Sequence, residues 1–205
     1  AQGSVDVTYA AFDPECRALA AAPVAQGLHP RGRVAVMAPT RYEWALADLA
    51  TWLAGGVVVP VYETSSPQQV AALVGSTAPT LAIAGGAAHR AALVAAAPTL
   101  PVWTMDAGPR DLAALAHTGR DVPAAVLEHR RRLAGPEDVA TIVHTSGTAA
   151  EQKGARITHG NLVGVVEAVT QAYGEVVHDR AVTIIALPWP TSWPAASNWR
   201  PSAPA

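Results

Sequence analysis

The sequence predicts an α/β fold in which helices cover a layered, parallel β-sheet. Short apolar runs that suit buried strands alternate with helical stretches from residue 33 to residue 103, and the connections between them are short. Half of the residues are hydrophobic but only 5% are aromatic, so the core must be built largely from Ala, Val and Leu. This combination is typical of closely packed sheet and helix layers.

The first strand and helix of this pattern lie in the first third of the chain. Residues 33–38 (Arg-Val-Ala-Val-Met-Ala) form a short apolar run that predicts a buried strand. Gly55 and Gly56 end the helix that follows. Residues 57–61 are almost continuously apolar, as expected of a strand covered on both faces. The helix between these strands has its apolar residues at the i, i+3, i+4, i+7 spacing of one face: Leu46, Leu49, Ala50 and Leu53.

The same alternation then repeats. We predict a helix at 68–74, a strand at 80–84, a helix at 87–97 and a strand at 101–103. The segment 106–136 is richer in charged and turn residues, and it indicates a peripheral helix plus a linker.

A further strand, residues 139–144, runs directly into a polar turn, and extended structure resumes at 156–158. Thr158 or Asn161 can cap the helix that follows. The turn therefore lies between a buried strand and further regular structure, where α/β proteins place ligand loops. The apolar face predicted for the last helix consists of Leu162, Val165, Val166, Val169 and Tyr173.

The polar turn, residues 145–154, reads Thr-Ser-Gly-Thr-Ala-Ala-Glu-Gln-Lys-Gly and contains the only lysine among fourteen Lys and Arg residues. Glycines let a backbone approach a phosphate and turn its N–H groups inward, hydroxyls donate to phosphate oxygens, and an ammonium adds a compact positive charge. The alternative is a polar hairpin without a ligand, but the strand context favours phosphate binding. The candidate nucleotide-binding residues are Thr145, Ser146, Gly147, Thr148, Lys153 and Gly154.

Other common sites are absent from the sequence. Gln152 and Gly154 flank Lys153, so the Gly-Lys-Ser/Thr requirement of the common P-loop is not met. No Rossmann glycine fingerprint, His-Glu-x-x-His or Gly-x-Ser-x-Gly motif occurs, and the single Cys16 excludes an internal disulfide framework. We predict no metal site from protein ligands. Surface or packing roles are expected for His29, His89, His117, His129 and His178.

The net charge and the hydropathy of the chain limit the classes of partner that it is expected to have. A net charge of −2 gives no electrostatic case for a nucleic acid or an anionic membrane, and the basic run 130–132 is interpreted as a solvated face. The most apolar window, residues 45–62, is interrupted by charged, glycine and proline residues, so no integral membrane segment is predicted. Residues 1–12 lack the pattern of a secretory signal. We expect a cytoplasmic protein with small-molecule partners.

The turn resembles the signature of the adenylate-forming enzymes, the superfamily of acyl-CoA synthetases and adenylation domains. That signature reads Thr-Ser-Gly-Thr-Thr-Gly-x-Pro-Lys-Gly and is closely followed by Thr-His-x-Asn. This chain departs from it at Ala149, Ala150 and Gln152, where the family has Thr, Gly and Pro. The matching residues are Thr145, Ser146, Gly147, Thr148, Lys153, Gly154, Thr158, His159 and Asn161.

Upstream segments resemble one branch of that superfamily, the long-chain fatty acid–CoA ligases. These segments are residues 32–37, 41–44 and 59–66, and the resemblance covers residues 8–187. The stretch Tyr-Glu-Thr-Ser-Ser after a Val-Pro strand is characteristic of this branch. For Tyr62 and Glu63 within it, we expect packing of the sheet against a helix.

The resemblance implies ATP-dependent activation of a long-chain fatty acid, first to an acyl adenylate and then to acyl-CoA. ATP, Mg²⁺ and coenzyme A would take part. Carried over by position, the three hydroxyl side chains of the turn would donate to phosphate oxygens and its two glycines would permit the turn. Lys153 would bind the leaving pyrophosphate. Positioning and charge stabilisation are the main contributions that a protein makes at a phosphoryl centre.

Several motifs of the family lie beyond the residues of this chain. These are the Tyr-Gly-x-Thr-Glu motif that binds adenine and Mg²⁺, the ribose-binding aspartate, and the catalytic lysine of the C-terminal domain. We therefore expect residues 1–188 to be a partial N-terminal AMP-binding domain, a fragment that is inactive alone. Two alternatives stay open: another adenylating enzyme that activates an aryl or amino acid, and a non-catalytic remnant that binds nucleotide weakly.

The last stretch has a composition unlike the rest, because residues 187–205 contain three of the six tryptophans and five prolines. Tryptophan has one codon, so a single base restored before Trp189 shifts the reading frame, and in that frame both Trp-Pro pairs read as an apolar residue followed by alanine. The shifted frame also allows a Leu-Pro-Leu-x-His segment like the one that follows the phosphate loop in the family. We hypothesise that residues 189–205 are an aberrant tail read out of frame.

The departures within the turn predict weakened ATP binding. Ala150 replaces a glycine, and a positive φ there would cost about 1 kcal/mol. Ala149 lacks a hydroxyl donor, and Gln152 lacks the fixed φ of proline. We expect the triple variant Ala149→Thr, Ala150→Gly, Gln152→Pro to bind ATP about fivefold more tightly in a calorimetric titration. Equal affinities of the two proteins would contradict this.

Overall fold

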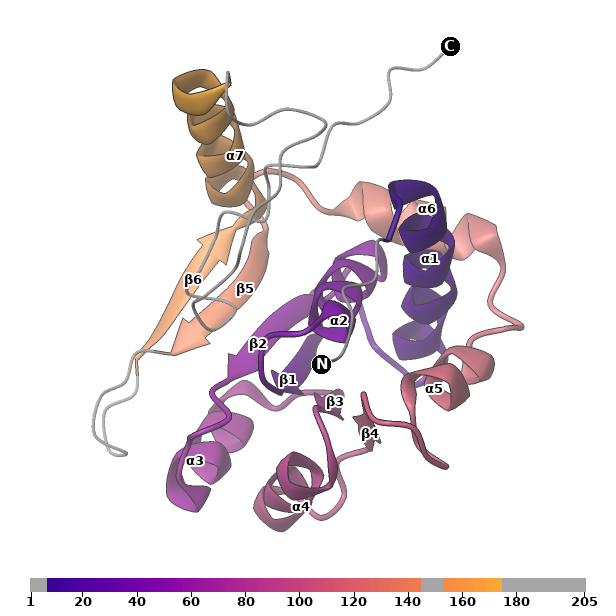
Figure 1. The fold of residues 1–205 in the computed structure, drawn as a ribbon, viewed down its shortest axis with the longest axis vertical. Coiled ribbons are helices and arrows are strands. Elements are labelled where there is room, and N and C mark those ends of the chain that lie inside the picture. Colours follow the sequence, from indigo (N-terminus) through magenta and orange to yellow (C-terminus); the bar gives the residue numbers. More distant parts are fainter. Residues whose placement is uncertain (1–6, 145–152, 175–205) are drawn as a thin grey trace, which may run out of the picture.

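The computed structural model describes residues 7–144 and 153–174. It confirms the α/β fold class, since six strands within these residues form one sheet in the order β4-β3-β1-β2-β5-β6, and helices lie on both of its faces (Figure 1). The predicted ends of these elements differ from the observed ends by three residues at most. The first elements of the sheet region are β1 (Arg33–Met37), α2 (Tyr42–Leu53), β2 (Val57–Val61), α3 (Pro67–Thr77), β3 (Leu81–Ala84), α4 (Ala87–Ala96) and β4 (Val102–Thr104).

Strands β1 to β4 are all parallel, as predicted. Parallel strands need a crossover connection, and each helix of the alternating pattern supplies one. Gly55 ends α2 with a φ of 74°, a left-handed conformation that glycine adopts without a steric penalty. The prediction that the glycine pair stops this helix is therefore confirmed.

Strand β6 is the exception to the parallel arrangement. Strand β5 (Val139–His144) pairs in parallel with β2, but β6 (Gly154–Thr158) pairs antiparallel with β5. The connection between β5 and β6 is too short for a crossover, so the chain can only return in the opposite direction. The sheet is therefore mixed and mostly parallel rather than wholly parallel.

Two helical regions differ from the sequence-based expectation. Helix α1 (Tyr9–Ala25) was not predicted, because its alanine-rich sequence and its two internal prolines give only weak amphipathic periodicity. The segment expected to hold one peripheral helix and a linker holds two helices, α5 (Leu112–Thr118) and α6 (Ala124–Leu133). Asp111 caps α5 by accepting a hydrogen bond from the Ala114 N–H at 2.8 Å.

The core has two parts, one on each face of the sheet. Successive residues of a strand point to opposite faces, so Val34 and Val36 of β1 pack with α1, α2 and α5. Ala35 and Met37 face the other way and pack with α3 and α4. These small and medium side chains let the layers approach closely, in agreement with the alanine- and valine-rich composition.

The only cysteine of the chain belongs to the first of these cores. Cys16 is buried in α1, and burial is the main cause that raises the pKa of its thiol to about 12. Its Sγ lies 3.9 Å from the Leu46 carbonyl oxygen, to which it donates. A buried thiol with a raised pKa forms little thiolate at neutral pH, so Cys16 has a packing role rather than a nucleophilic one.

Helix α7 (His159–Tyr173) follows β6 and extends away from the sheet layers (Figure 1). Of its predicted apolar face, Leu162 is buried, while Val165 and Tyr173 are exposed. The prediction of a helix is confirmed, but most of that face is not covered within the described residues. The domain boundary expected at residue 188 and the tail 189–205 lie outside those residues. None of the helices described has the combination of length and apolarity needed to cross a bilayer.

The end of α3 carries a strained residue. Ala78 caps the helix in the left-handed conformation, with φ 43° and ψ 61°, which costs a residue with a Cβ about 1 kcal/mol. We expect Ala78→Gly to raise the free energy of unfolding by about 1 kcal/mol in a urea titration. As a matched control, Ala91→Gly in the exposed interior of α4 should lower it by about 1 kcal/mol. A loss of stability in Ala78→Gly would contradict this account.

Candidate functional site

The carboxyl ends of the parallel strands share one edge of the sheet. β2 and β5 are neighbours there, with Val58 paired to Thr141, so Val61 and His144 end these strands at the same level. The polar turn starts immediately after His144. In open α/β sheets this edge is the usual place for ligands.

The structure describes two of the six candidate nucleotide-binding residues. Lys153 is exposed and directly precedes β6, and Gly154 is the first residue of that strand. Both residues lie beside the end of β5, where Gly154 pairs with His144. The other four candidates lie outside the described residues: Thr145, Ser146, Gly147 and Thr148.

Gly154 is required by close packing. It pairs with His144 across the β5–β6 hairpin. A Cβ at this position would lie 2.9 Å from Cγ2 of Ile142 and 3.1 Å from Nε2 of His144, which leaves no room for a side chain. Its φ is not positive, so the requirement for glycine that the described residues show at this position is steric.

His144 is a residue that the sequence analysis did not single out. Its side chain is only 6% exposed, and burial lowers the pKa of its imidazole, with the Ile142 backbone opposing that shift. The ring is therefore neutral at pH 7. Its Nδ1 is buried and has no hydrogen-bond partner among the described residues. The only signal in the sequence was its position as the last residue of the strand before the turn.

Two side-chain hydrogen bonds anchor β5 to the rest of the sheet. Trp52 of α2 donates from Nε1 to the Ala140 carbonyl oxygen at 2.8 Å. Thr141 donates from Oγ1 to the Val58 carbonyl oxygen at 3.0 Å. The strand that leads into the turn is thus tied to a covering helix and to the neighbouring strand.

The second part of the signature, Thr158-His159-Gly160-Asn161, starts α7. Thr158 Oγ1 accepts a hydrogen bond from the Asn161 N–H at 3.1 Å, and Asn161 Oδ1 accepts one from the Thr158 N–H at 3.0 Å. This reciprocal pair is a capping box, and it confirms the predicted helix start.

The two residues inside this capping box contact α2 and the segment before β5. The His159 ring meets Trp52 edge to face, with ring centroids 6.0 Å apart, and burial lowers the pKa of His159. The Gly160 N–H donates to the Pro136 carbonyl oxygen at 2.7 Å, and a Cβ on Gly160 would lie 2.9 Å from that oxygen. The Thr-His-x-Asn motif therefore fixes the exit of β6 against the entry of β5, and its role is structural.

Arg41 joins three loops at the carboxyl edge. Its guanidinium donates to Glu43 at 2.6 Å, to Asp106 at 2.8 Å and to the Gly85 carbonyl oxygen at 3.3 Å. The Arg41 hydrogen bond is the main cause that lowers the pKa of Glu43. This network connects the loops that follow β1, β3 and β4 at the carboxyl edge of the sheet.

The expectation for residues 62 and 63 holds only in part. Tyr62 is half-buried at the end of β2, consistent with packing. Glu63 is exposed, so the packing role expected for it is wrong. The chain turns towards α3 at this point, and the carboxylate stays in solvent.

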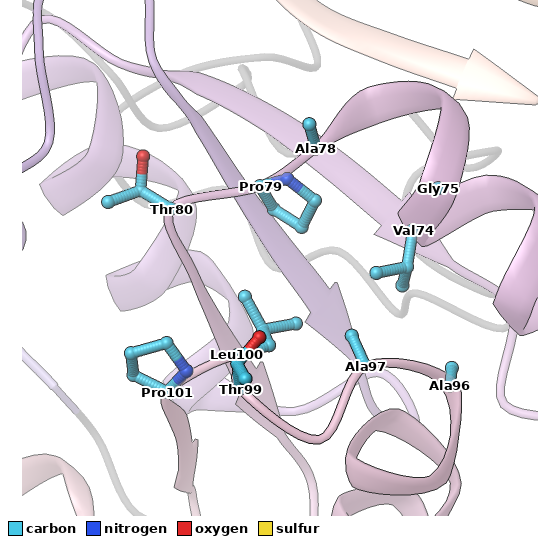
Figure 2. A pocket seen from close by; sticks show the side chains of 10 residues that line it. All are labelled: Val74, Gly75, Ala78, Pro79, Thr80, Ala96, Ala97, Thr99, Leu100 and Pro101. Carbon is cyan, nitrogen blue, oxygen red and sulfur yellow. The ribbon is translucent and has the colours of Figure 1, made fainter.

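A cavity of ≈ 330 Å³ lies at the opposite edge of the sheet (Figure 2). It lies between the ends of α3 and α4, next to the starts of β3 and β4, and no titratable side chain lines it. It therefore offers no chemistry for nucleotide activation. Its lining residues are Val74, Gly75, Ala78, Pro79, Thr80, Ala96, Ala97, Thr99, Leu100 and Pro101.

The mostly parallel sheet, with a lysine-containing turn at the carboxyl ends of its strands, fits the class of adenylate-forming enzymes. A family model described as AMP-binding enzyme matches residues 2–196, and the chain therefore belongs to the AMP-binding enzyme family. The resemblance of the turn and its flanking motifs to the adenylate-forming superfamily is confirmed.

Curated relatives with different described activities share the same sequence identity with this chain, 30%. The chain is 30% identical to the long-chain-fatty-acid–CoA ligase FadD15 of Mycobacterium tuberculosis over 188 residues, which are 89% of this chain and 31% of the relative. It is 30% identical to a probable non-canonical nonribosomal peptide synthetase, CymA of Salinispora arenicola, over 84% of this chain and 2% of that protein. The chain spans about a third of the length of the fatty acid ligase that it matches.

Solved structures show the same fold. The ATP-bound MatB from Rhodopseudomonas palustris superposes with a TM-score of 0.71 at 25% identity, covering 86% of this chain and 34% of MatB. VinN superposes with a TM-score of 0.68 at 23% identity, over 82% of this chain and 41% of VinN. The layered sheet described above is thus the fold of the corresponding part of adenylate-forming enzymes.

The steric role of Gly154 gives a prediction. Gly154→Ala should lower the free energy of unfolding by about 1–3 kcal/mol, because the new Cβ overlaps Ile142 and His144. A matched control is Gly164→Ala inside α7, where a Cβ meets open space and the better helix propensity of alanine should add about 1 kcal/mol. Urea unfolding measures both. Equal effects of the two substitutions would contradict the packing described for Gly154.

Proposed function

We propose that this chain supplies the ATP-phosphate-binding part of an enzyme that activates a long-chain fatty acid. A carboxylate oxygen of the acid attacks the α-phosphorus of ATP, and the bond from that phosphorus to pyrophosphate breaks. The thiol of coenzyme A then attacks the acyl carbon and displaces AMP, which leaves a thioester. The observation that carries the proposal is the lysine-containing turn between β5 and β6, in a chain that belongs to the AMP-binding enzyme family.

Each candidate residue has a role in this proposal. The hydroxyls of Thr145, Ser146 and Thr148 donate to the β- and γ-phosphate oxygens, and Gly147 lets the backbone approach them. Lys153, exposed at the carboxyl edge, provides the charge that stabilises the leaving pyrophosphate. Gly154 holds the strand end beside it.

Mg²⁺ enters this proposal as part of the MgATP substrate. Among the described residues, no group of three or more His, Cys, Asp or Glu side chains is arranged to hold a metal ion. The phosphate oxygens of ATP are hard ligands that Mg²⁺ prefers, so the ion arrives bound to the nucleotide. Coenzyme A is likewise a co-substrate, and we propose a cytoplasmic location for the reaction.

The choice of a long-chain fatty acid rests on two observations. The segments 32–37, 41–44 and 59–66 resemble the fatty acid ligase branch, and FadD15 is described as a long-chain-fatty-acid–CoA ligase. The similarity to the peptide synthetase CymA favours a second candidate, activation of an amino acid. Pyrophosphate exchange into ATP, measured with a longer protein that includes the adenine-binding motif, separates them, since exchange that depends on palmitate supports the first and exchange that depends on amino acids supports the second.

The division of the chain at residue 188 is also a proposal. The Trp- and Pro-rich composition of residues 189–205 supports it, and sequencing the gene across the codons for residues 187–193 tests it. An extra base that restores an apolar-Ala pair would support an out-of-frame tail. Unchanged bases, with the same codons in an independent isolate, would contradict a sequencing error.

Phosphate binding by the turn is tested with the chain itself. We expect Lys153→Ala to weaken MgATP binding about tenfold or more, because it removes a charge-assisted contact to phosphate. Arg156→Ala is the matched control, since Arg156 is another exposed cation three residues further along β6 and should bind MgATP as the parent does. Calorimetric titration measures all three proteins. Equal affinity of Lys153→Ala and the parent would contradict the proposed role.

A further inference from the structure

Helix α7 carries an apolar face that is open to solvent. Three of the seven large hydrophobic side chains that are exposed within the described residues belong to this helix: Val163, Val165 and Tyr173. Val165 and Tyr173 lie four residues to either side of the half-buried Val169, so these three side chains line up along one face, the Val–Tyr face. The helix itself extends away from the sheet layers (Figure 1).

The sequence of α7 is that of a helix covered on several sides. Between residues 162 and 173 the polar residues are Glu167, Thr170 and Gln171, and all others are apolar, aromatic or glycine. Glu167 and Gln171 are one turn apart and lie opposite the Val–Tyr face. A helix that is apolar round most of its circumference is normally buried, yet Leu162 is the one residue of α7 that is buried within the described part of the chain. The Val–Tyr face therefore requires a further partner.

The segment that follows α7 contains a run that suits this face. Residues 181–187 read Ala-Val-Thr-Ile-Ile-Ala-Leu, and such a continuous apolar run rich in β-branched residues predicts a strand covered on both faces. The polar residues 178–180 precede the run, and Pro188 ends it. Residues 181–187 lie outside the described residues, so this expectation rests on the sequence.

The lengths of the two segments agree. The connection, residues 175–180, spans about 20 Å when fully extended, so the run starts close to the end of α7. A strand over 181–187 is about 23 Å long. Helix α7, with 15 residues, is about 22 Å long. Consecutive elements usually lie side by side, and a strand that returns along α7 would match the whole length of the Val–Tyr face.

We propose that residues 181–187 form a strand that runs antiparallel to α7 and packs on its Val–Tyr face. The face is thus an interaction surface whose partner is a segment of the same chain. Packing removes the valines of the helix and the β-branched side chains of the strand from water together. Glu167 and Gln171, on the opposite side, stay in solvent. The inference concerns the assembly of the fold and does not depend on nucleotide binding.

Thiol labelling of the full chain tests this proposal. The one native cysteine, Cys16, is buried and its pKa is raised to about 12, so an introduced thiol reacts first. Val165→Cys places a thiol on the Val–Tyr face. Gln171→Cys is the matched control, because Gln171 is exposed on the opposite side of the same helix. Reaction with a maleimide is followed by mass spectrometry, and slow labelling of Cys16 reports that the core stays folded.

We expect the thiol of Val165→Cys to react about tenfold more slowly than that of Gln171→Cys, because the strand must open before the reagent can enter. Since side chains of a strand alternate between its faces, Ile184→Asp with Ile185→Asp places a charge on both faces of the proposed strand. In that background the Val165→Cys thiol should react as fast as the Gln171→Cys thiol.

A matched pair of substitutions controls for the added charges. Ala195→Asp with Ala196→Asp adds the same two carboxylates outside the run and should leave the slow labelling of Val165→Cys unchanged. If the aspartates at 184 and 185 expose Cys16, Ile184→Ala with Ile185→Ala is the milder pair that decides, and it should also speed the labelling.

Two results would overturn the inference. The first is equal labelling of Val165→Cys and Gln171→Cys, which would show that the Val–Tyr face is open in the full chain. The second is slow labelling of Val165→Cys that the substitutions of Ile184 and Ile185 do not change while Cys16 stays buried. Another surface would then cover the face, and protection lost on dilution would identify that surface as a second copy of the chain.

Discussion

The close approach of β5 and β6 at the pair His144–Gly154 is the constraint on which the candidate site depends. Among the strands that the structure describes, β6 pairs with β5 alone, so the place of Lys153 is set by this contact rather than by the sheet as a whole. The contact is possible only because Gly154 has no side chain. Trp52 of α2 and the Val58 carbonyl of β2 hold β5 in place through hydrogen bonds. The pairing of β5 with β6 then places the exposed Lys153 relative to the core.

The signature of the family divides into two parts with different physical tasks. The first part, the turn after β5, carries hydroxyls, glycines and an ammonium and suits a polyphosphate. The second part, Thr158 to Asn161, makes a capping box and contacts Trp52 and the Pro136 carbonyl. It therefore holds the end of β6 and the start of α7 against α2 and the segment before β5. A sequence match to both parts therefore covers the proposed phosphate-binding turn together with the segment that supports it.

The fold could be predicted where local sequence decides it. The apolar runs of β2 and β5 and the glycine stop after α2 gave elements with the right type and place, because burial and backbone freedom act locally. The direction of β6 could not be predicted from periodicity, which is the same in parallel and antiparallel strands. His144 was missed for a related reason: its burial and its contact with Gly154 arise only when two strands pair. Helix α1 was missed because its alanine-rich sequence has little periodicity.

The single lysine allows the central claim, that Lys153 contacts bound nucleotide phosphate, to be tested directly. The chain is treated with a limiting amount of acetic anhydride, with and without saturating MgATP, and the extent of acetylation is read by mass spectrometry. Lys153 is the only side-chain amine, and the terminal α-amine serves as an internal reference. The account predicts that MgATP slows acetylation of Lys153 several-fold and leaves the α-amine unchanged. Equal acetylation of Lys153 with and without MgATP, under conditions where calorimetry shows the nucleotide bound, would contradict it.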